Sequence, residues 1–205
     1  MPDAPVLYCG TFSKTMFPGL RIGFVVAPPG LARPLAAMRA QSSASGRAAE
    51  QLALAGFLRS GEFMAHLRRM RRLYRQRRDA LVAALARHLG RIAEVHGASA
   101  GMHLALRLPD ERLSDVAISA RAREEGIIVN PLSAHALGGG APWNGLMLGY
   151  AQVPAERMDV LVRRLAAVVH LAAYEAGSGP TPAGPDRPAC RSPSAASSPW
   201  RRRRS

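Results

Sequence analysis

The pattern that most constrains this fold is a continuous apolar stripe in residues 61–89. Six apolar side chains recur there at intervals of three, four and seven residues, which is the spacing of one helix face: Phe63, Leu67, Met70, Tyr74, Leu81 and Leu85. Gly90 follows at a usual position for a left-handed helix cap. We therefore expect one long amphipathic helix that ends at Gly90.

Arginines cover much of the remaining surface of this expected helix, and they have two interpretations. The seven are Arg68, Arg69, Arg71, Arg72, Arg75, Arg77 and Arg78, in a chain of net charge +14. One interpretation is a solvated face whose side-chain stems cover apolar neighbours. The other is a surface for nucleic acid or an acidic partner. We favour the solvated face because no surface aromatics that could stack on bases are interleaved with the arginines.

Lys14 is the only lysine among the 28 lysine and arginine residues of this 205-residue chain. Arginine replaces lysine wherever only a positive charge is needed, but its guanidinium is never deprotonated and cannot form a Schiff base. A single retained amine is therefore a candidate nucleophile toward a carbonyl, the role that lysine has with pyridoxal phosphate. Chance survival of one lysine is the competing interpretation.

Two runs of β-forming residues, 6–12 and 21–27, flank this lysine, and we expect two buried strands there. The loop between them holds a Pro-Gly turn and four groups that suit phosphate: the hydroxyls of Thr11 and Ser13, the amine of Lys14 and the guanidinium of Arg21. Arginine binds phosphate oxygens in a bidentate fork. The loop is thus suited to holding a phosphate beside a reactive lysine.

The sequence of residues 7–21 is Leu-Tyr-Cys-Gly-Thr-Phe-Ser-Lys-Thr-Met-Phe-Pro-Gly-Leu-Arg. It resembles the lysine segment of fold type I pyridoxal-phosphate enzymes, the aspartate aminotransferase superfamily. Within that superfamily it resembles the aminotransferase-like domain of MocR-type regulators of the GntR family. The similarity continues through residues 63–78 and 145–151 and covers residues 6 to about 170. The resemblance implies an α/β fold, with part of the cofactor-binding large domain followed by a C-terminal small α/β domain.

The resemblance also implies roles for individual residues. Lys14 would carry the pyridoxal phosphate as a Schiff base, Arg21 would bind its phosphate, Thr11 would add a phosphate hydroxyl, and Ser13 would support them. No metal is expected. The implied reaction transfers an amino group from an amino-acid-like donor. Two alternatives stay open: a MocR-type effector domain that senses pyridoxal phosphate or an amino ligand, and an inactive fragment.

Proteins of this type have an upstream half that is expected to be missing here. That half supplies a glycine-containing phosphate loop, an aromatic residue on the pyridine ring and an aspartate on the pyridine nitrogen, whereas Asp3 is the only acidic residue before Lys14. MocR-type regulators also begin with a winged helix-turn-helix, so contact with DNA is expected only through a domain absent from this chain. We expect a C-terminal fragment, a homodimer by family resemblance and a small amino compound as ligand.

The remaining chain alternates between expected helices and strands. The helices are expected at residues 30–39, 46–59, 113–125 and 155–174, and the strands at 92–95, 102–108, 127–129 and 146–150. The stretch Gly101-Met-His-Leu resembles the family's strand on the substrate side, and the loop at 131–140 is expected to approach the cofactor edge. His103 either faces a ligand or is a hydrogen-bonded structural histidine, and we favour the structural role.

The binding site for a substrate carboxylate is not evident in the sequence. Related enzymes usually place an arginine just upstream of the Gly-Leu-x-Leu-Gly-Tyr strand, where a bidentate contact orients an amino acid. This chain has Pro142, Trp143 and Asn144 there, and no arginine between Arg123 and Arg157. Three interpretations of Trp143 stay open: it contacts a different ligand, it marks a degenerate substrate site, or it is an aromatic residue with a packing role only. His103 and Trp143 are therefore weak candidates for substrate binding.

These observations divide the chain into four expected parts. They are a large-domain remnant (1–60), a linker helix (61–90), a small domain (91–175) and a disordered tail rich in Pro, Ser and Arg (176–205). Cys9, in a strand expected to be buried, and Cys190, in the tail, make no disulfide framework. Neither a signal peptide nor a membrane span is expected, so we expect a cytoplasmic protein without membrane contact.

Overall fold

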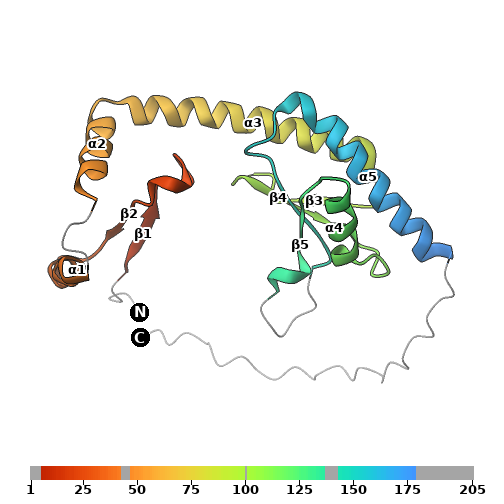
Figure 1. Ribbon diagram of the computed structural model, residues 1–205, viewed down its shortest axis with the longest axis horizontal. Coiled ribbons are helices and arrows are strands. Elements are labelled where there is room, and N and C mark those ends of the chain that lie inside the picture. Colours follow the sequence, from red (N-terminus) through yellow and green to blue (C-terminus); the bar gives the residue numbers. More distant parts are fainter. Residues whose placement is uncertain (1–5, 43–46, 100, 137–142, 179–205) are drawn as a thin grey trace, which may run out of the picture.

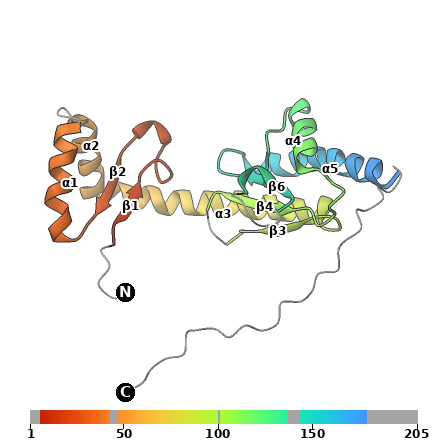
Figure 2. The same ribbon diagram turned by 90° about the horizontal axis from the view of Figure 1, so that it is seen from below.

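The computed structural model describes residues 6–42, 47–99, 101–136 and 143–178. Its longest element, helix α3 (Glu62–Leu89), joins two groups of elements (Figures 1 and 2). The first group comprises β1 (Tyr8–Thr11), the 3-10 helix η1 (Pro18–Leu20), β2 (Gly23–Val26), α1 (Pro29–Ser42) and α2 (Ala48–Arg59). The second comprises β3 (Glu94–His96), β4 (His103–Arg107), α4 (Asp115–Glu124), β5 (Asn130–Pro131), η2 (Ser133–His135), β6 (Gly145–Gly149) and α5 (Ala155–Ser178).

The long helix expected from the apolar stripe is confirmed, but the expected left-handed cap at its end is wrong. Gly90 is the C-cap with φ −60°, in the right-handed region. Glycine still has a physical reason there, because a Cβ would lie 2.5 Å from the carbonyl oxygen of Ala86. Close approach to the preceding turn, rather than a positive φ, therefore explains the glycine.

The hydrophobic core lies in the second group of elements. Among the described residues, every buried apolar side chain except Leu54 lies between Leu81 and Val169. Helix α5 packs along the C-terminal half of α3, as both views show. Leu85 and Leu89 of α3 meet Val169 of α5 in this core, all at most 1% exposed. The second group therefore has a core of its own.

A four-stranded antiparallel sheet in the order β3-β4-β6-β5 completes the second group. Because side chains alternate between the two faces of a strand, Leu104 and Leu106 face the core together with Leu146 and Leu148. His103, Ala105 and Arg107 lie on the opposite face of β4. One sheet face is therefore packed against helices, while the other is available for a site.

The expectation of two buried strands around Lys14 is wrong. Strands β1 and β2 form an antiparallel hairpin and pair only with each other among the described residues. Their side chains are exposed, with Tyr8 at 62%, Val25 at 54% and Phe24 at 43%. Cys9, expected to be buried, is exposed as well. The hairpin has β-forming residues, but the described part of the chain does not cover it closely enough to bury them.

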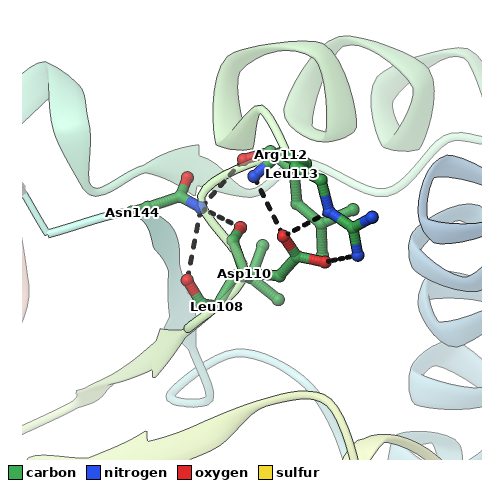
Figure 3. Close-up of polar contacts among 5 residues, drawn as sticks. All are labelled: Leu108, Asp110, Arg112, Leu113 and Asn144. Atoms are coloured by element: carbon green, nitrogen blue, oxygen red, sulfur yellow. Dashed lines mark hydrogen bonds and ion pairs between the residues drawn. The ribbon is translucent and has the colours of Figure 1, made fainter. Parts of the chain in front are cut away.

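Asn144 joins the loop before α4 to the start of β6 (Figure 3). Its Nδ2 donates hydrogen bonds to the carbonyl oxygens of Leu108 and Asp110, both at 3.2 Å, and of Leu113 at 2.8 Å. In the same loop, the side chain and backbone N–H of Arg112 donate to Asp110 and hold the pKa of that carboxyl below its ordinary value. The side-chain amide of Asn144 thus acts as a clamp on this loop.

The carboxylate of Asp115, the first residue of α4, also binds the start of β6. Asp115 is 3% exposed and accepts hydrogen bonds from the backbone N–H of Gly145 at 3.1 Å and from the N–H of Ser133 at 2.9 Å. Helix α4 begins after Ser114, its N-cap residue, whose Oγ accepts a hydrogen bond from the N–H of Ala117. The polar groups buried at this junction therefore have partners.

Two of the other expected elements differ from the structure. The strand expected at 127–129 instead occurs at Asn130–Pro131, which pairs with β6, and Ile128 is 74% exposed. The last helix extends to Ser178, three residues into the segment expected to be a disordered tail. Residues 179–205, with Cys190, lie outside the described residues, as do 137–142 of the loop expected near the cofactor.

Candidate functional site

Lys14 lies in the loop that connects β1 to β2. The backbone N–H of Phe12 donates to the carbonyl of Ile22 at 3.0 Å, which closes the hairpin, and Met16 N–H donates to the Phe12 carbonyl at 2.8 Å. The hydroxyl of Thr11 donates to the Oγ of Ser13 and accepts from the Ser13 N–H, both at 3.1 Å. These bonds form a tight turn that orients the residues just before the lysine.

Three contacts fix this loop against the helices behind it. The Nε2 of His66 on α3 lies 2.9 Å from the carbonyl oxygen of Thr15, although the two residues are 51 positions apart. The rings of Phe12 and Phe63 meet edge to face, with centroids 5.8 Å apart. A guanidinium nitrogen of Arg47 donates to the carbonyl of Leu20 at 2.9 Å. The position of the lysine therefore depends on the long helix.

A cavity of about 530 Å³ lies between the lysine loop and the second group of elements. The loop contributes Ser13, Lys14 and residues 16–18, α3 contributes Tyr74, and the small sheet contributes residues 102–103, 149 and 151–153. This volume is in the range of small-molecule sites. No carboxylate is among the lining residues, whereas the amine of Lys14 is. The lining therefore favours negatively charged ligand groups.

His103 is a residue of the small sheet that lies on the same cavity as Lys14. It begins β4, is exposed and lines the cavity with Lys14. Its imidazole makes no hydrogen bond with the part of the chain that the structure describes, and the choice between a ligand contact and a structural role stays a prediction. The two candidate residues of the sequence analysis thus differ, because His103 shares the cavity of Lys14 and Trp143 does not.

Trp143 packs at the other end of the same sheet face. Its ring meets that of His96 edge to face, with centroids 4.9 Å apart, and the guanidinium of Arg107 lies 5.9 Å from its ring centroid. Such contacts are ordinary for a partly exposed aromatic residue. Trp143 is 53% exposed, and which of its three roles applies stays a prediction.

Arg21 does not line the cavity of Lys14 but a second one. It lines a space of about 610 Å³ between β2, α1 and α2, together with Arg39 and Arg47. Its backbone has φ 50°, the left-handed conformation, and among the described residues it is the only non-glycine with a positive φ. Its N–H donates to the Pro18 carbonyl at 3.3 Å. The role of Arg21 with the cofactor phosphate stays a prediction.

Sequence reasoning did not assign a role to three residues of this region. Tyr74 was recognised only as part of the apolar stripe, although it also lines the cavity. Gln152 lines the cavity from the segment after β6. His66 supports the lysine loop from α3. A polar residue within an otherwise apolar helix face was the available signal for His66, and the sequence contained no comparable signal for Gln152.

Metal and membrane sites are not indicated in the described ranges. Their His, Cys, Asp and Glu side chains form no group of three or more that could hold a metal ion. Among the same residues, no helix combines the length and the apolar character that a membrane crossing requires.

Comparison with known proteins decides the family. The family model described as aminotransferase class I and II matches residues 1–165. The chain belongs to this family. The structure has the fold type I architecture of pyridoxal-phosphate-dependent aminotransferases and contains only part of their large domain.

The relatives of this aminotransferase-family chain include both regulators and enzymes. The probable rhizopine catabolism regulatory protein MocR of Rhizobium meliloti is 39% identical over 153 residues, which are 75% of this chain and 31% of that protein. The transcriptional regulator YhdI of Bacillus subtilis is 34% identical over 80% of this chain and 34% of its own length. The chain therefore spans about a third of the length of these curated relatives.

A solved aminotransferase provides the structural comparison. The α-aminoadipate aminotransferase LysN of Thermus thermophilus, complexed with N-(5'-phosphopyridoxyl)-L-leucine, has a TM-score of 0.74 and 30% identity. The match covers 85% of this chain and 44% of LysN. This aminotransferase-family chain therefore shares its fold with less than half of a complete enzyme.

Proposed function

We propose that this chain binds pyridoxal phosphate through Lys14 and acts as an aminotransferase-like domain on a small amino compound. The observation that carries the proposal is the position of Lys14, the only lysine, on the cavity between the lysine loop and the small sheet. Family membership and the phosphopyridoxyl compound in the LysN structure support the choice of cofactor.

The chemistry divides between the cofactor and the chain. When bound, pyridoxal phosphate supplies an aldehyde that condenses with amines and a ring that accepts electrons. The Nζ of Lys14 is the atom that would hold the cofactor, because an amine is a nucleophile toward an aldehyde. When it does not hold the cofactor, the same Nζ would be the base that moves a proton at the substrate carbon.

The neighbouring residues are proposed to hold the phosphate. Arg21 has the fork of donors that matches phosphate oxygens, and Arg39 and Arg47 line the same hollow. The Thr11 hydroxyl donates its proton to the Oγ of Ser13 in the structure, so it would have to turn to donate to the phosphate, while the N–H of Ser13 still holds its oxygen at 3.1 Å. These donors fit a dianionic phosphate better than a neutral ligand.

The test is a titration of the purified chain with pyridoxal phosphate, followed by absorbance. We expect a new band at the violet edge of the visible spectrum in the wild type and none in Lys14→Ala or Lys14→Arg. Lys14→Arg keeps the charge but cannot condense with the aldehyde. Identical spectra for wild type and both variants would reject the proposal and favour an inactive fragment.

Borohydride reduction of the complex locates the modified nitrogen. Because the chain has one lysine, the only other primary amine is the α-amino group at the N-terminus. Fragmentation of the N-terminal peptide by mass spectrometry places the added mass on one or the other. We expect it on Lys14, and mass found only on the α-amino group would contradict the proposal.

A second function is favoured by the relatives, since YhdI is named as a transcriptional regulator and MocR as a probable regulatory protein. In that case the same site binds an amino ligand to change a regulator's shape, and DNA is contacted only through a separate domain. Release of a keto acid from an amino donor distinguishes the two functions. Turnover supports an aminotransferase, whereas saturable binding of the donor without keto acid supports an effector domain.

The organisation of the whole protein is part of the proposal. Residues 1–60 are assigned to the cofactor-binding large domain, 61–90 to the linker helix, 91–175 to the small domain and 176–205 to a tail. A homodimer in the cytoplasm is proposed as the working form, by analogy with the family. Light scattering on the purified chain measures its mass and tests the dimer directly.

A further inference from the structure

We propose that His103 binds the carboxylate of the amino ligand, so that the site prefers amino acids to simple amines. The inference rests on the proposed function, because it assumes that the ligand of Lys14 occupies the cavity that His103 also lines. It assigns to a histidine the contact for which the sequence shows no arginine between Arg123 and Arg157.

The position of His103 makes its imidazole available. Its neighbours Leu104 and Leu106 face the core at 2% and 0% exposure, and alternation along β4 turns His103 to the other face. There the imidazole is exposed and has no hydrogen-bond partner among the residues that the structure describes. An imidazole carries at least one N–H in every protonation state, so His103 brings an unused donor to the cavity.

Gly149 leaves the space that this imidazole occupies. It lies opposite His103 in the antiparallel pairing of β4 and β6 and lines the same cavity. A Cβ on residue 149 would lie 3.3 Å from the Cδ2 and 3.5 Å from the Nε2 of His103. A side chain there would press on the ring, so glycine permits the placement of the imidazole beside the cavity.

The charges around the cavity favour an anionic ligand group. Lys14 and His103 are the only lining residues that can carry a positive charge, and none of the lining residues is acidic. Once the Lys14 nitrogen is engaged with the cofactor, His103 is the remaining group of this kind. Tyr74 and Gln152 are neutral donors in the same lining. A carboxylate is therefore matched best by His103.

A matched ligand pair tests this assignment on the full chain loaded with pyridoxal phosphate. L-norleucine and pentylamine have the same alkyl chain and amine, and only norleucine has a carboxylate. Spectral titration gives a Kd for each in the wild type, His103→Phe, His103→Gln and Gln152→Leu. His103→Phe keeps a planar ring without a donor, and Gln152→Leu is the control on a neutral donor of the same cavity.

We expect His103→Phe to lower the preference for norleucine over pentylamine about tenfold or more, the usual effect of losing a hydrogen bond to a charged group. The Kd for pentylamine should stay within about twofold, and His103→Gln should recover part of the preference because its amide donates. An unchanged preference in His103→Phe, or loss of the preference in Gln152→Leu alone, would overturn the assignment.

A second measurement tests His103 if the wild type forms no Lys14-dependent band, which would reject the proposed function by itself. Norleucine is then titrated into the cofactor-free chain, and the imidazole C–H signals of its six histidines are followed by NMR. The signal missing from His103→Phe identifies His103. A saturable shift of that signal supports a carboxylate contact, and no shift at saturating ligand rejects it.

Discussion

The Nε2 of His66 lies 2.9 Å from the carbonyl oxygen of Thr15, the residue that follows Lys14. A carbonyl only accepts hydrogen bonds, so in this contact the N–H of His66 is the donor. The two residues lie on α3 and on the lysine loop. The long helix therefore fixes the backbone that presents the only lysine.

We predict that His66→Ala weakens the binding of pyridoxal phosphate by about fivefold to tenfold, because one hydrogen bond of about 1 kcal/mol holds the loop. His170→Ala is the matched control, since the Nε2 of His170 contacts the carbonyl of His88 at 3.2 Å, away from Lys14. Titration of each variant with the cofactor gives the two Kd values. Equal weakening in both variants would show a general loss of stability instead.

A second prediction concerns the phosphate. We expect Arg21→Gln to weaken the binding of pyridoxal phosphate by about tenfold or more, since a charge-assisted pair is lost. The affinity for pyridoxal, which lacks the phosphate, should change little. Arg69→Gln removes the same charge from the exposed surface of α3 and should leave both affinities unchanged. If Arg21→Gln affects the two compounds equally, the arginine supports the loop rather than the phosphate.

The secondary structure could be predicted where a local pattern determines it. The stripe from Phe63 to Leu85 has one helical period and no competing signal, so α3 was correctly expected. The β-forming runs around Lys14 likewise gave two strands. Burial was predicted wrongly for Tyr8 and Phe24, because it depends on whether a second layer covers the hairpin. β-Forming residues carry no information about that layer.

The site could be predicted only in part, for a related reason. Lys14 can be singled out because arginine cannot take over the chemistry of an amine, which is a property of the residue itself, and its role stays a prediction. The roles of His103 and Trp143 depend on which residues surround them across strands, and a single sequence does not show this. Asn144 was noted only as part of a segment without arginine, while its side-chain hydrogen bonds reach residues 29 to 36 positions away.

A third prediction tests the clamp formed by Asn144 (Figure 3). Asn144→Ala leaves the carbonyl oxygens of Leu108 and Leu113 without this donor, and it removes one of two donors from that of Asp110, so we expect the free energy of unfolding to fall by about 2–3 kcal/mol. Asn130→Ala is the control, because Asn130 is exposed on β5. Urea unfolding followed by circular dichroism measures both variants. Similar losses in the two would contradict a special role for the Asn144 amide.

The last prediction concerns pH and the contact between α3 and α5. The Nε2 of His88 donates to Oδ1 of Asp159 at 3.0 Å, and Arg87 also pairs with this carboxylate. The hydrogen bond from His88, followed by the charge of Arg87, holds the pKa of Asp159 below its ordinary value of 3.8. Because the pKa is lowered by folding, the ionised carboxylate adds stability above pH 3.8, and this contribution is lost as the pH falls through the folded-state pKa.

We therefore expect Asp159→Asn to lower the melting temperature at pH 7 and the difference from wild type to shrink once the pH falls below that ordinary value. Thermal unfolding across a pH series measures the difference. In a His88→Ala background, the effect of Asp159→Asn at pH 7 should be smaller, because the main cause of the lowered pKa is gone. A difference that is the same at every pH would show that Asp159 stabilises the helix pair through packing and not through its charge.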